Sequence, residues 1–173
     1  MAEPVHIHAL VAADLPKYKA LRDSMLATHP EAFTADAATE RARTLQSFLP
    51  RLGLEQAGGG RFVLGAWQSS QLVGALGCER DMRVKVCHIG HLVGMMVRTE
   101  LQGAGIGRQL LAAGIEAARQ VEGMEMLTLT VTATNAAAVR LYERAGFVRF
   151  GSLPRAIRVD GRYHAKDHML LTL

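Results

Sequence analysis

The sequence is organised around one stretch, residues 92–120, which is LVGMMVRTELQGAGIGRQLLAAGIEAARQ. Its hydrophobic start, 92–97, predicts a buried strand, and a short polar bend at 98–101 leads into a glycine-rich turn and an alanine-rich helix. Gly103, Gly105 and Gly107 let the main chain come close to a ligand. The first amides of a helix lack partners and carry partial positive charge. The stretch therefore predicts a strand, loop and helix that bind a phosphate group.

The glycine spacing disfavours two common nucleotide sites. A dinucleotide site requires Gly-x-Gly-x-x-Gly and a carboxylate after the next strand. Residues 103–107 are GAGIG, and the next predicted strand, 126–132, is followed by Ala-Thr-Asn. A nucleoside triphosphate loop requires Gly-Lys-Ser/Thr, whereas Gly107 is followed by Arg108 and Gln109. Nicotinamide, adenosylmethionine and triphosphate ligands are all disfavoured.

Two motifs together resemble those of a known family. The first is Gln/Arg-x-x-Gly-x-Gly/Ala, present as QGAGIG at 102–107. The second is NAAAVRLYERAGF at 135–147, with Asn135, Tyr142 and the closing Gly146 and Phe147 in register. Both are similar to the central motifs of the GNAT family of N-acetyltransferases, which move an acetyl group from acetyl-CoA to an amine. The order of predicted elements extends the resemblance over nearly the whole chain.

Length and composition indicate a single domain over residues 1–173. The chain is 49% hydrophobic and 21% charged, as in ordinary globular proteins. A net charge of +4 with scattered basic residues suits anionic small molecules, and we expect no nucleic acid partner. The start lacks a secretion signal and no apolar run approaches the roughly 20 residues of a membrane helix. We therefore expect a cytoplasmic protein without a membrane partner.

Two cysteines, Cys78 and Cys87, are expected to be free thiols in that compartment. If residues 82–83 form a hairpin tip, the two would lie nearly opposite each other on neighbouring strands. Buried, chemically inert thiols are the favoured interpretation, and a redox role stays open.

Hydrophobic periodicity predicts a mixed α/β (α+β) fold. We expect a central twisted, mostly antiparallel sheet of about seven strands with about four helices. Strands are predicted at 6–10, 61–68, 71–79, 86–97, 126–132, from residue 147, and at 168–173. Helices are predicted from Asp14 to about 28, at 44–54, from about residue 105 to 121, and at 135–145, with flexible glycines at 58–60.

Within this scheme the helix after the glycine turn crosses over to make strand 126–132 parallel to strand 86–97. Five of its residues recur at helical spacing and are predicted to face the sheet, namely Ile106, Leu110, Ala113, Ala117 and Val121. Asp160 and Gly161 predict a two-residue type I′ hairpin near the C-terminus.

The resemblance implies where acetyl-CoA binds. Main-chain groups at the end of strand 86–97 would hold the pantetheine arm and the thioester carbonyl, and amides of the glycine turn would hold the pyrophosphate. The two parallel strands would splay to leave a slot. The implied cofactor-binding residues are Met95, Met96, Val97, Gln102, Gly103, Ala104, Gly105, Ile106, Gly107, Arg108, Asn135 and Tyr142.

Asn135 and Tyr142 are also linked by their spacing. Seven residues make about two helical turns and place both side chains on nearly one face, roughly 10 Å apart along the axis. Asn135 could contact the ligand through its amide, and Tyr142 is the predicted general acid, donating to the departing thiolate. The alternatives are a helix N-cap for Asn135 and a core aromatic for Tyr142.

The general base is not identified by the sequence. Some family members carry a glutamate where this chain has Thr130. Candidates are Glu31, Asp36, Glu79, His88 and His91, and the two histidines, three apart, are predicted to point to opposite faces of their strand. A lysine-type amine would lose roughly 4 kcal/mol near neutral pH by being protonated, and an α-amine well under 1 kcal/mol. Without a strong base, an α-amine acceptor is therefore favoured.

The sequence also contains two histidine pairs and one basic group. His6 with His8, and His164 with His168, lack a cysteine or carboxylate at ligand spacing, so no metal site is predicted. A basic group around the last hairpin would either attract an acidic acceptor or form a solvated edge that discourages strand aggregation; it comprises Arg155, Arg158, Arg162 and Lys166.

The predicted function is an acetyl-CoA-dependent N-acetyltransferase acting on a primary amine of a small molecule or protein. The alternative from another class is a non-catalytic domain that binds or senses acyl-CoA. A longer acyl donor is a second alternative. The acceptor and the oligomeric state are left open; the resemblance implies a homodimer through the C-terminal strands, which is common in the family.

Overall fold

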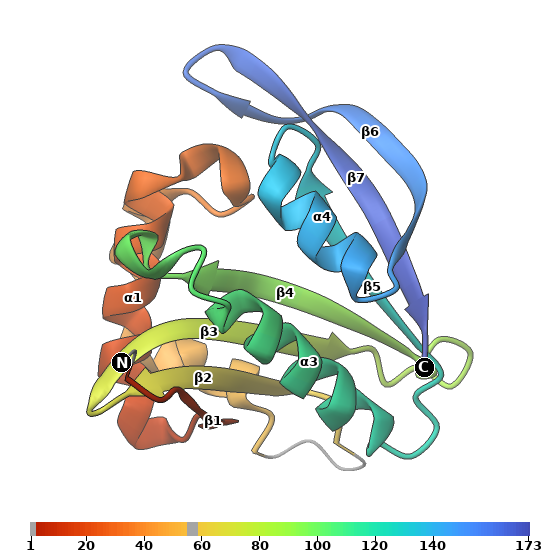
Figure 1. Ribbon diagram of the computed structural model, residues 1–173, viewed down its shortest axis with the longest axis horizontal. Helices are drawn as coiled ribbons and strands as arrows, with labels where there is room; N and C mark the ends of the chain where they lie inside the picture. The colour runs from red at the N-terminus through yellow and green to blue at the C-terminus, as the bar shows by residue number, and fades with distance from the viewer. Residues whose placement is uncertain (1–2, 55–58) are drawn as a thin grey trace.

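A seven-stranded sheet forms the centre of the molecule (Figure 1). The computed structural model describes residues 3–54 and 59–173. The strand order is β1-β2-β3-β4-β5-β7-β6, and every neighbouring pair is antiparallel except the parallel pair β4 and β5. The strands are β1 (His6–Ala9), β2 (Phe62–Gln68), β3 (Gln71–Arg80), β4 (Ile89–Val97), β5 (Met126–Thr132), β6 (Val148–Val159) and β7 (Arg162–Thr172). The predicted mixed, mostly antiparallel sheet is confirmed.

Helices cover both faces of this sheet. The described residues form four α-helices, α1 (Leu15–Thr28), α2 (Ala37–Arg41), α3 (Ile106–Arg119) and α4 (Ala136–Arg144). They also form short 3₁₀ segments, η1 (Ala12–Asp14), η2 (Pro30–Ala32), η3 (Leu45–Leu52) and η4 (Thr99–Leu101). One hydrophobic core joins α3 and Tyr142 of α4 to the sheet, and a second joins α1 and η3 to the other face. Figure 1 shows α3 crossing in front of β2 to β4, with α4 alongside β5 and β7.

The parallel strands β4 and β5 separate after a short region of pairing. Their register runs from Ile89 opposite Met126 to His91 opposite Thr128 and then stops. On its other side, β4 carries a bulge against β3, because the pairing shifts between Ala75 and Gly77. Gly94, in the bulge, has a φ of +61°, a conformation that glycine adopts without penalty. The predicted splay is thus present and leaves a slot in the middle of the sheet.

The β3–β4 hairpin differs from the prediction. β4 begins at Ile89 instead of residue 86, because the preceding chain folds into turns in which the amides of Val86 and Cys87 donate to the Arg83 carbonyl. Cys78 therefore pairs with Leu92 in β4, and the expected position opposite Cys87 was wrong. Both thiols are free, and burial raises the pKa of Cys78 to about 12, which keeps it protonated.

The segment predicted as helix 44–54 consists of η3 alone, and the short α2 precedes it. The Asp36 carboxylate accepts a hydrogen bond from the amide of Thr39 at 2.8 Å and so caps α2. Gly58, one of the predicted flexible glycines, lies outside the described residues. The buried face of α3 is broader than predicted. Ile106 and Leu110 are buried as expected, and Ala113 and Val121 pack against the core while partly exposed. The remaining buried positions are Leu111, Gly114, Ile115 and Ala118, and Ala117 is not among them.

The C-terminal hairpin is confirmed. Asp160 and Gly161 both have positive φ, at 48° and 77°, between paired Val159 and Arg162. The last strand is longer than predicted, since β7 begins at Arg162. Among the helices that the structure describes, none is both long and apolar enough to span a bilayer.

Candidate active site

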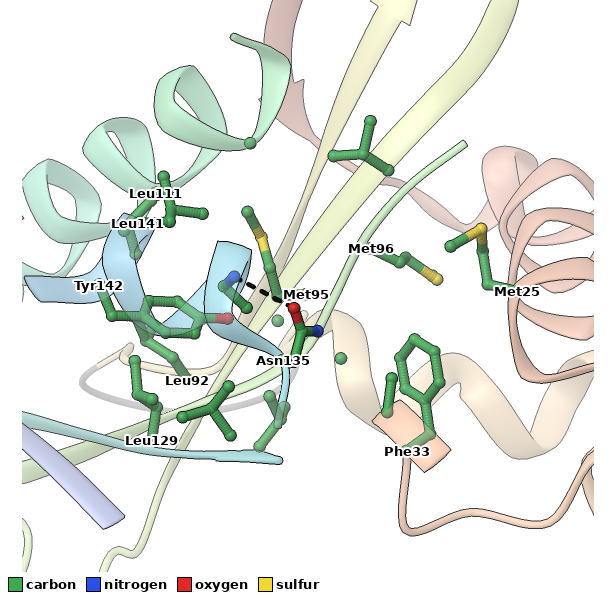
Figure 2. A pocket seen from close by; sticks show the side chains of 18 of the residues that line it. Met25, Phe33, Leu92, Met95, Met96, Leu111, Leu129, Asn135, Leu141 and Tyr142 are labelled. Carbon is green, nitrogen blue, oxygen red and sulfur yellow. Dashed lines mark hydrogen bonds between the residues drawn. The ribbon is translucent and has the colours of Figure 1, made fainter. Parts of the chain in front are cut away.

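A large cavity passes through the slot between β4 and β5. Its volume is about 1590 Å³, and its lining comes from both faces of the sheet. On one face it is bordered by the loop before α3 and by α4, and on the other by α1 and the loop after it. In Figure 2, Tyr142, Asn135 and Met95 lie on the first side, and Met25, Met96 and Phe33 lie on the second. The cavity can therefore hold two ligands that meet in the slot.

The loop before α3 forms an anion cradle. Gly103 and Gly105 both have φ of +84°, and the space beside each α-carbon is open. In the described part of the chain, the amides of residues 105–108 donate to no acceptor, since they form the first turn of α3 and Gly105 has no side chain to cap it. Four free amides at the positive end of a 14-residue helix suit a diphosphate.

The cradle is tied to the end of β4. The side-chain amide of Gln102 donates to the carbonyl of Val97 at 3.2 Å. Eleven of the twelve predicted cofactor residues line the cavity: Met95, Met96, Val97, Gln102, Gly103, Ala104, Gly105, Gly107, Arg108, Asn135 and Tyr142. The exception is Ile106, whose side chain is buried in the core and 1% exposed. Only its main-chain amide is available to a ligand, so the prediction for this residue holds at most for the backbone.

Asn135 caps α4. Its Oδ1 accepts a hydrogen bond from the amide of Ala138 at 3.2 Å, shown as the dashed line in Figure 2. The N-cap alternative is therefore correct. It does not exclude a ligand contact, because the cap uses the oxygen and leaves the Nδ2 donors on an exposed side chain that lines the cavity.

Tyr142 is held by the core and reaches into the cavity with its hydroxyl. The residue is 7% exposed, and its ring packs edge-to-face on Phe147 with centroids 6.0 Å apart. Figure 2 shows the hydroxyl directed toward Met95 and Asn135. Burial raises the pKa of Tyr142 to about 12. The phenol is thus fully protonated at neutral pH and can act as a proton donor.

The other half of the cavity is built largely from α1 and the loop after it. Tyr18, Arg22, Met25 and Phe33 line it, together with Arg51 of η3. Arg22 and Arg51 are held by Glu40, at 2.5 and 3.6 Å, and Arg43 also binds this carboxylate at 3.0 Å. The sequence did not single these residues out, because no local pattern marks an ion cluster that joins three segments.

The candidates for a general base are distributed unevenly. Glu31 and Glu79 line the cavity, whereas Asp36, His88 and His91 do not. Asp36 caps α2, and the hydrogen bonds from Thr39 lower its pKa. His91 bonds through Nδ1 to Thr128 Oγ1 at 2.5 Å. His88 lies before β4 begins, so the prediction that both histidines lie on one strand was wrong.

The four residues of the basic group around the last hairpin differ in their exposure. The Arg155 guanidinium lies over the ring of Tyr163 at 4.9 Å, and Arg155, Arg158 and Arg162 are exposed. Lys166 is different, because it is 8% exposed and lines the cavity. The expectation of a solvated edge is wrong for this residue.

Comparison with known proteins identifies the family. A family model described as Acetyltransferase (GNAT) family matches residues 18–147. A mycothiol acetyltransferase from Salinispora tropica is 31% identical over 140 residues, which are 81% of this chain and 43% of that protein. The chain belongs to the GNAT family of acetyltransferases. It spans less than half the length of the first curated relatives that it matches, at 43% and 41%.

Solved structures share the fold over nearly the whole chain. A GNAT-family acetyltransferase from Streptococcus pneumoniae superposes with a TM-score of 0.84 at 26% identity, covering 98% of this chain and 100% of that one. A Salmonella typhimurium protein solved with acetyl-CoA has a TM-score of 0.83 at 21% identity, covering 98% and 94%. The second likeness concerns the fold alone.

Proposed function

We propose that this chain is an acetyl-CoA-dependent N-acetyltransferase that acts on a primary amine of a small molecule or protein by direct attack on the thioester. Family membership supports the reaction class. The observation that carries the proposal is the continuous cavity, which joins a main-chain anion cradle on one face of the sheet to a second lined compartment on the other. A binding module that only senses acyl-CoA has no need of the second compartment.

The residues present fit acetyl-CoA. The free amides of residues 105–108 would hold the diphosphate, with Gly103 and Gly105 keeping the approach open. The Gln102 bond to Val97 fixes the loop to β4, whose unpaired edge toward β5 offers main-chain groups to the pantetheine arm. When bound, acetyl-CoA supplies an activated acyl carbonyl.

Tyr142 and Asn135 are proposed as the catalytic pair. The Tyr142 phenol keeps its proton at neutral pH and points toward Met95 and Asn135 in the cavity, where it would give the proton to the departing thiolate. Asn135 holds the start of α4 in place through its oxygen, and its Nδ2 can donate to the ligand. Glu31 and Glu79 line the cavity and could receive the amine proton directly or through water.

The test is thiol release from acetyl-CoA with a panel of amino acids, small amines, antibiotics and peptides. The expected result is acceptor-dependent release that is lost in a Gly105→Glu variant. Calorimetry measures the affinity for coenzyme A separately. Tight binding without release from any amine would support the sensing alternative, and absence of binding would place the ligand elsewhere.

We also propose one domain, a cytoplasmic protein and a homodimer through the C-terminal strands. β6 is the edge strand of the sheet and exposes Val148, Phe150 and Leu153 at 58%, 59% and 53%. Exposed apolar side chains on an edge strand favour association. Sedimentation should give a dimer mass that falls to the monomer in a Phe150→Lys variant.

A further inference from the structure

Lys166 lies beside the slot between β4 and β5. The pairing of these two strands ends at His91 and Thr128, so Thr132, four residues further along β5, lies where the strands have separated, and it lines the cavity. Lys166 pairs with Thr132 in the next strand. Leu129, Val131 and Met169 belong to the core under α3 and α4. By strand alternation, Lys166 and Thr132 face the opposite compartment, where Thr132 Oγ1 donates to the Glu31 carbonyl at 2.7 Å.

The charge of Lys166 has no counter-ion in the described part of the chain. No carboxylate there lies within 4.0 Å of its ammonium, and no hydrogen bond to it is found among those residues. Its neighbour Asp167 is paired with Arg149 at 3.4 Å on the other face. Burial lowers the pKa of Lys166 for want of any compensating partner.

Among the described residues, the arginines of the compartment, unlike Lys166, have a carboxylate partner, although three arginines share it. Arg22 and Arg51 share the carboxylate of Glu40. Lys166 is therefore a side chain more than nine-tenths buried that lines the cavity with an uncompensated charge. An isolated buried ammonium is unfavourable, and a ligand that brings a negative group removes the penalty.

We propose that Lys166 binds the anionic group of the acceptor and that the acceptor is a small amine with a carboxylate a few bonds from its nitrogen, as in an α-amino acid. This rests on the proposed function. One strand separates Lys166 from the slot, and adjacent strands are about 4.8 Å apart. An acceptor that spans this distance has its amine and its anionic group close together. Peptides and proteins, whose α-amine lies next to a neutral amide, lack that arrangement. Lys166 is thus both a binding and a specificity-determining residue.

The experiment compares free amino acids with their carboxamides in wild type, Lys166→Met and Lys166→Arg. Methionine keeps the length of the side chain and removes the charge, and arginine keeps the charge. In wild type, kcat/KM for the acids should exceed that for the amides by about tenfold or more. Lys166→Met should lower kcat/KM for the acids by a similar factor, leave the amides within threefold and leave coenzyme A affinity unchanged. Lys166→Arg should retain most of the preference.

Equal loss for acids and amides, or no wild-type preference, would overturn the assignment, as would peptides proving the best acceptors. Calorimetric binding of the same amino acids to the coenzyme A complex provides a reading without turnover. Binding that disappears in Lys166→Met supports the anionic subsite even if no acetyl transfer is seen, and binding that persists refutes it. Failure of the subsite and failure of the proposed activity are thus separate results.

Discussion

The side-chain amide of Gln102 donates to the main-chain carbonyl of Val97 at 3.2 Å, joining the anion cradle to the end of β4. Gln102→Ala should weaken coenzyme A binding about fivefold, because a hydrogen bond of this kind contributes about 1 kcal/mol. Calorimetry measures the change. Gln109→Ala, on the exposed side of α3, is the control and should bind as wild type. Equal affinity of the two variants would show that the tie does not order the cradle.

Two substitutions at Gly105 distinguish the effect of backbone strain from the effect of charge at the cradle. Its φ of +84° penalises any side chain, so Gly105→Ala and Gly105→Glu share that strain. Only glutamate adds bulk and a negative charge beside the free amides. We expect alanine to lower coenzyme A affinity moderately and glutamate to lower it by a further hundredfold or more. Similar affinities in titrations of both variants would mean that no phosphate binds at this turn.

Tyr142→Phe removes the proton donor and keeps the ring that packs on Phe147. Turnover should fall by about 10²-fold, the lower range for loss of a general acid, while coenzyme A affinity stays within a few-fold. Steady-state rates and calorimetry give the two values. Loss of both together would assign Tyr142 to the scaffold of the slot.

The pH profile follows from the raised pKa of Tyr142. Because burial raises this pKa to about 12, the phenol keeps its proton well above the ordinary value of about 10. The rate should therefore rise with deprotonation of the acceptor and then stay level up to about pH 10. If the rate instead falls between about pH 8 and 10 and Tyr142→Phe abolishes this fall, the pKa of Tyr142 is not raised.

Glu40 stabilises the wall of the second compartment. Burial raises the pKa of Glu40, but the hydrogen bonds from Arg22 and Arg43 outweigh this and hold the pKa below its ordinary value. Removing the carboxylate leaves Arg22 buried with its charge unpaired, so Glu40→Gln should lower the free energy of unfolding by about 3 kcal/mol.

The contribution of Glu40 should be complete above the ordinary carboxyl pKa and be lost as pH falls through the lowered folded-state pKa. Denaturant titrations at neutral and acid pH measure it. Glu116→Gln, which removes an exposed carboxylate 3.9 Å from Arg119, is the control and should change stability by less than about 0.5 kcal/mol. A variant of Glu40 as stable as this control at neutral pH would show that the cluster is dispensable.

Local patterns predicted the shape of the glycine turn and of α4, where the donor is proposed to bind. The glycine spacing of residues 102–107 and the step from Asn135 to Tyr142 depend on a few neighbouring residues, whose conformations follow from turn and helix geometry. Asp160 and Gly161 likewise specify their own turn. Ile106 shows the limit of such patterns. The motif predicts a ligand contact for its main-chain amide only, because its side chain is buried in the core.

The second compartment, where the acceptor is proposed to bind, could not be predicted in the same way. Glu40 gathers arginines from α1 and η3 as well as its near neighbour Arg43, and Lys166 becomes buried only because β7 lies between β5 and β6. Those placements depend on pairings between distant segments. The prediction that Cys87 lies opposite Cys78 was wrong for a related reason, since the length of a hairpin loop decides which residues face each other.

The passage through the sheet has a consequence for how such a protein can diversify. In the proposed arrangement, the donor would contact chiefly the backbone and residues of β4, α3 and α4, whereas the acceptor would contact side chains on α1, η2 and β7. Substitutions that change the shape of one compartment therefore leave the shape of the other unchanged. Selectivity for the acceptor can therefore change during evolution while the binding of the donor is conserved.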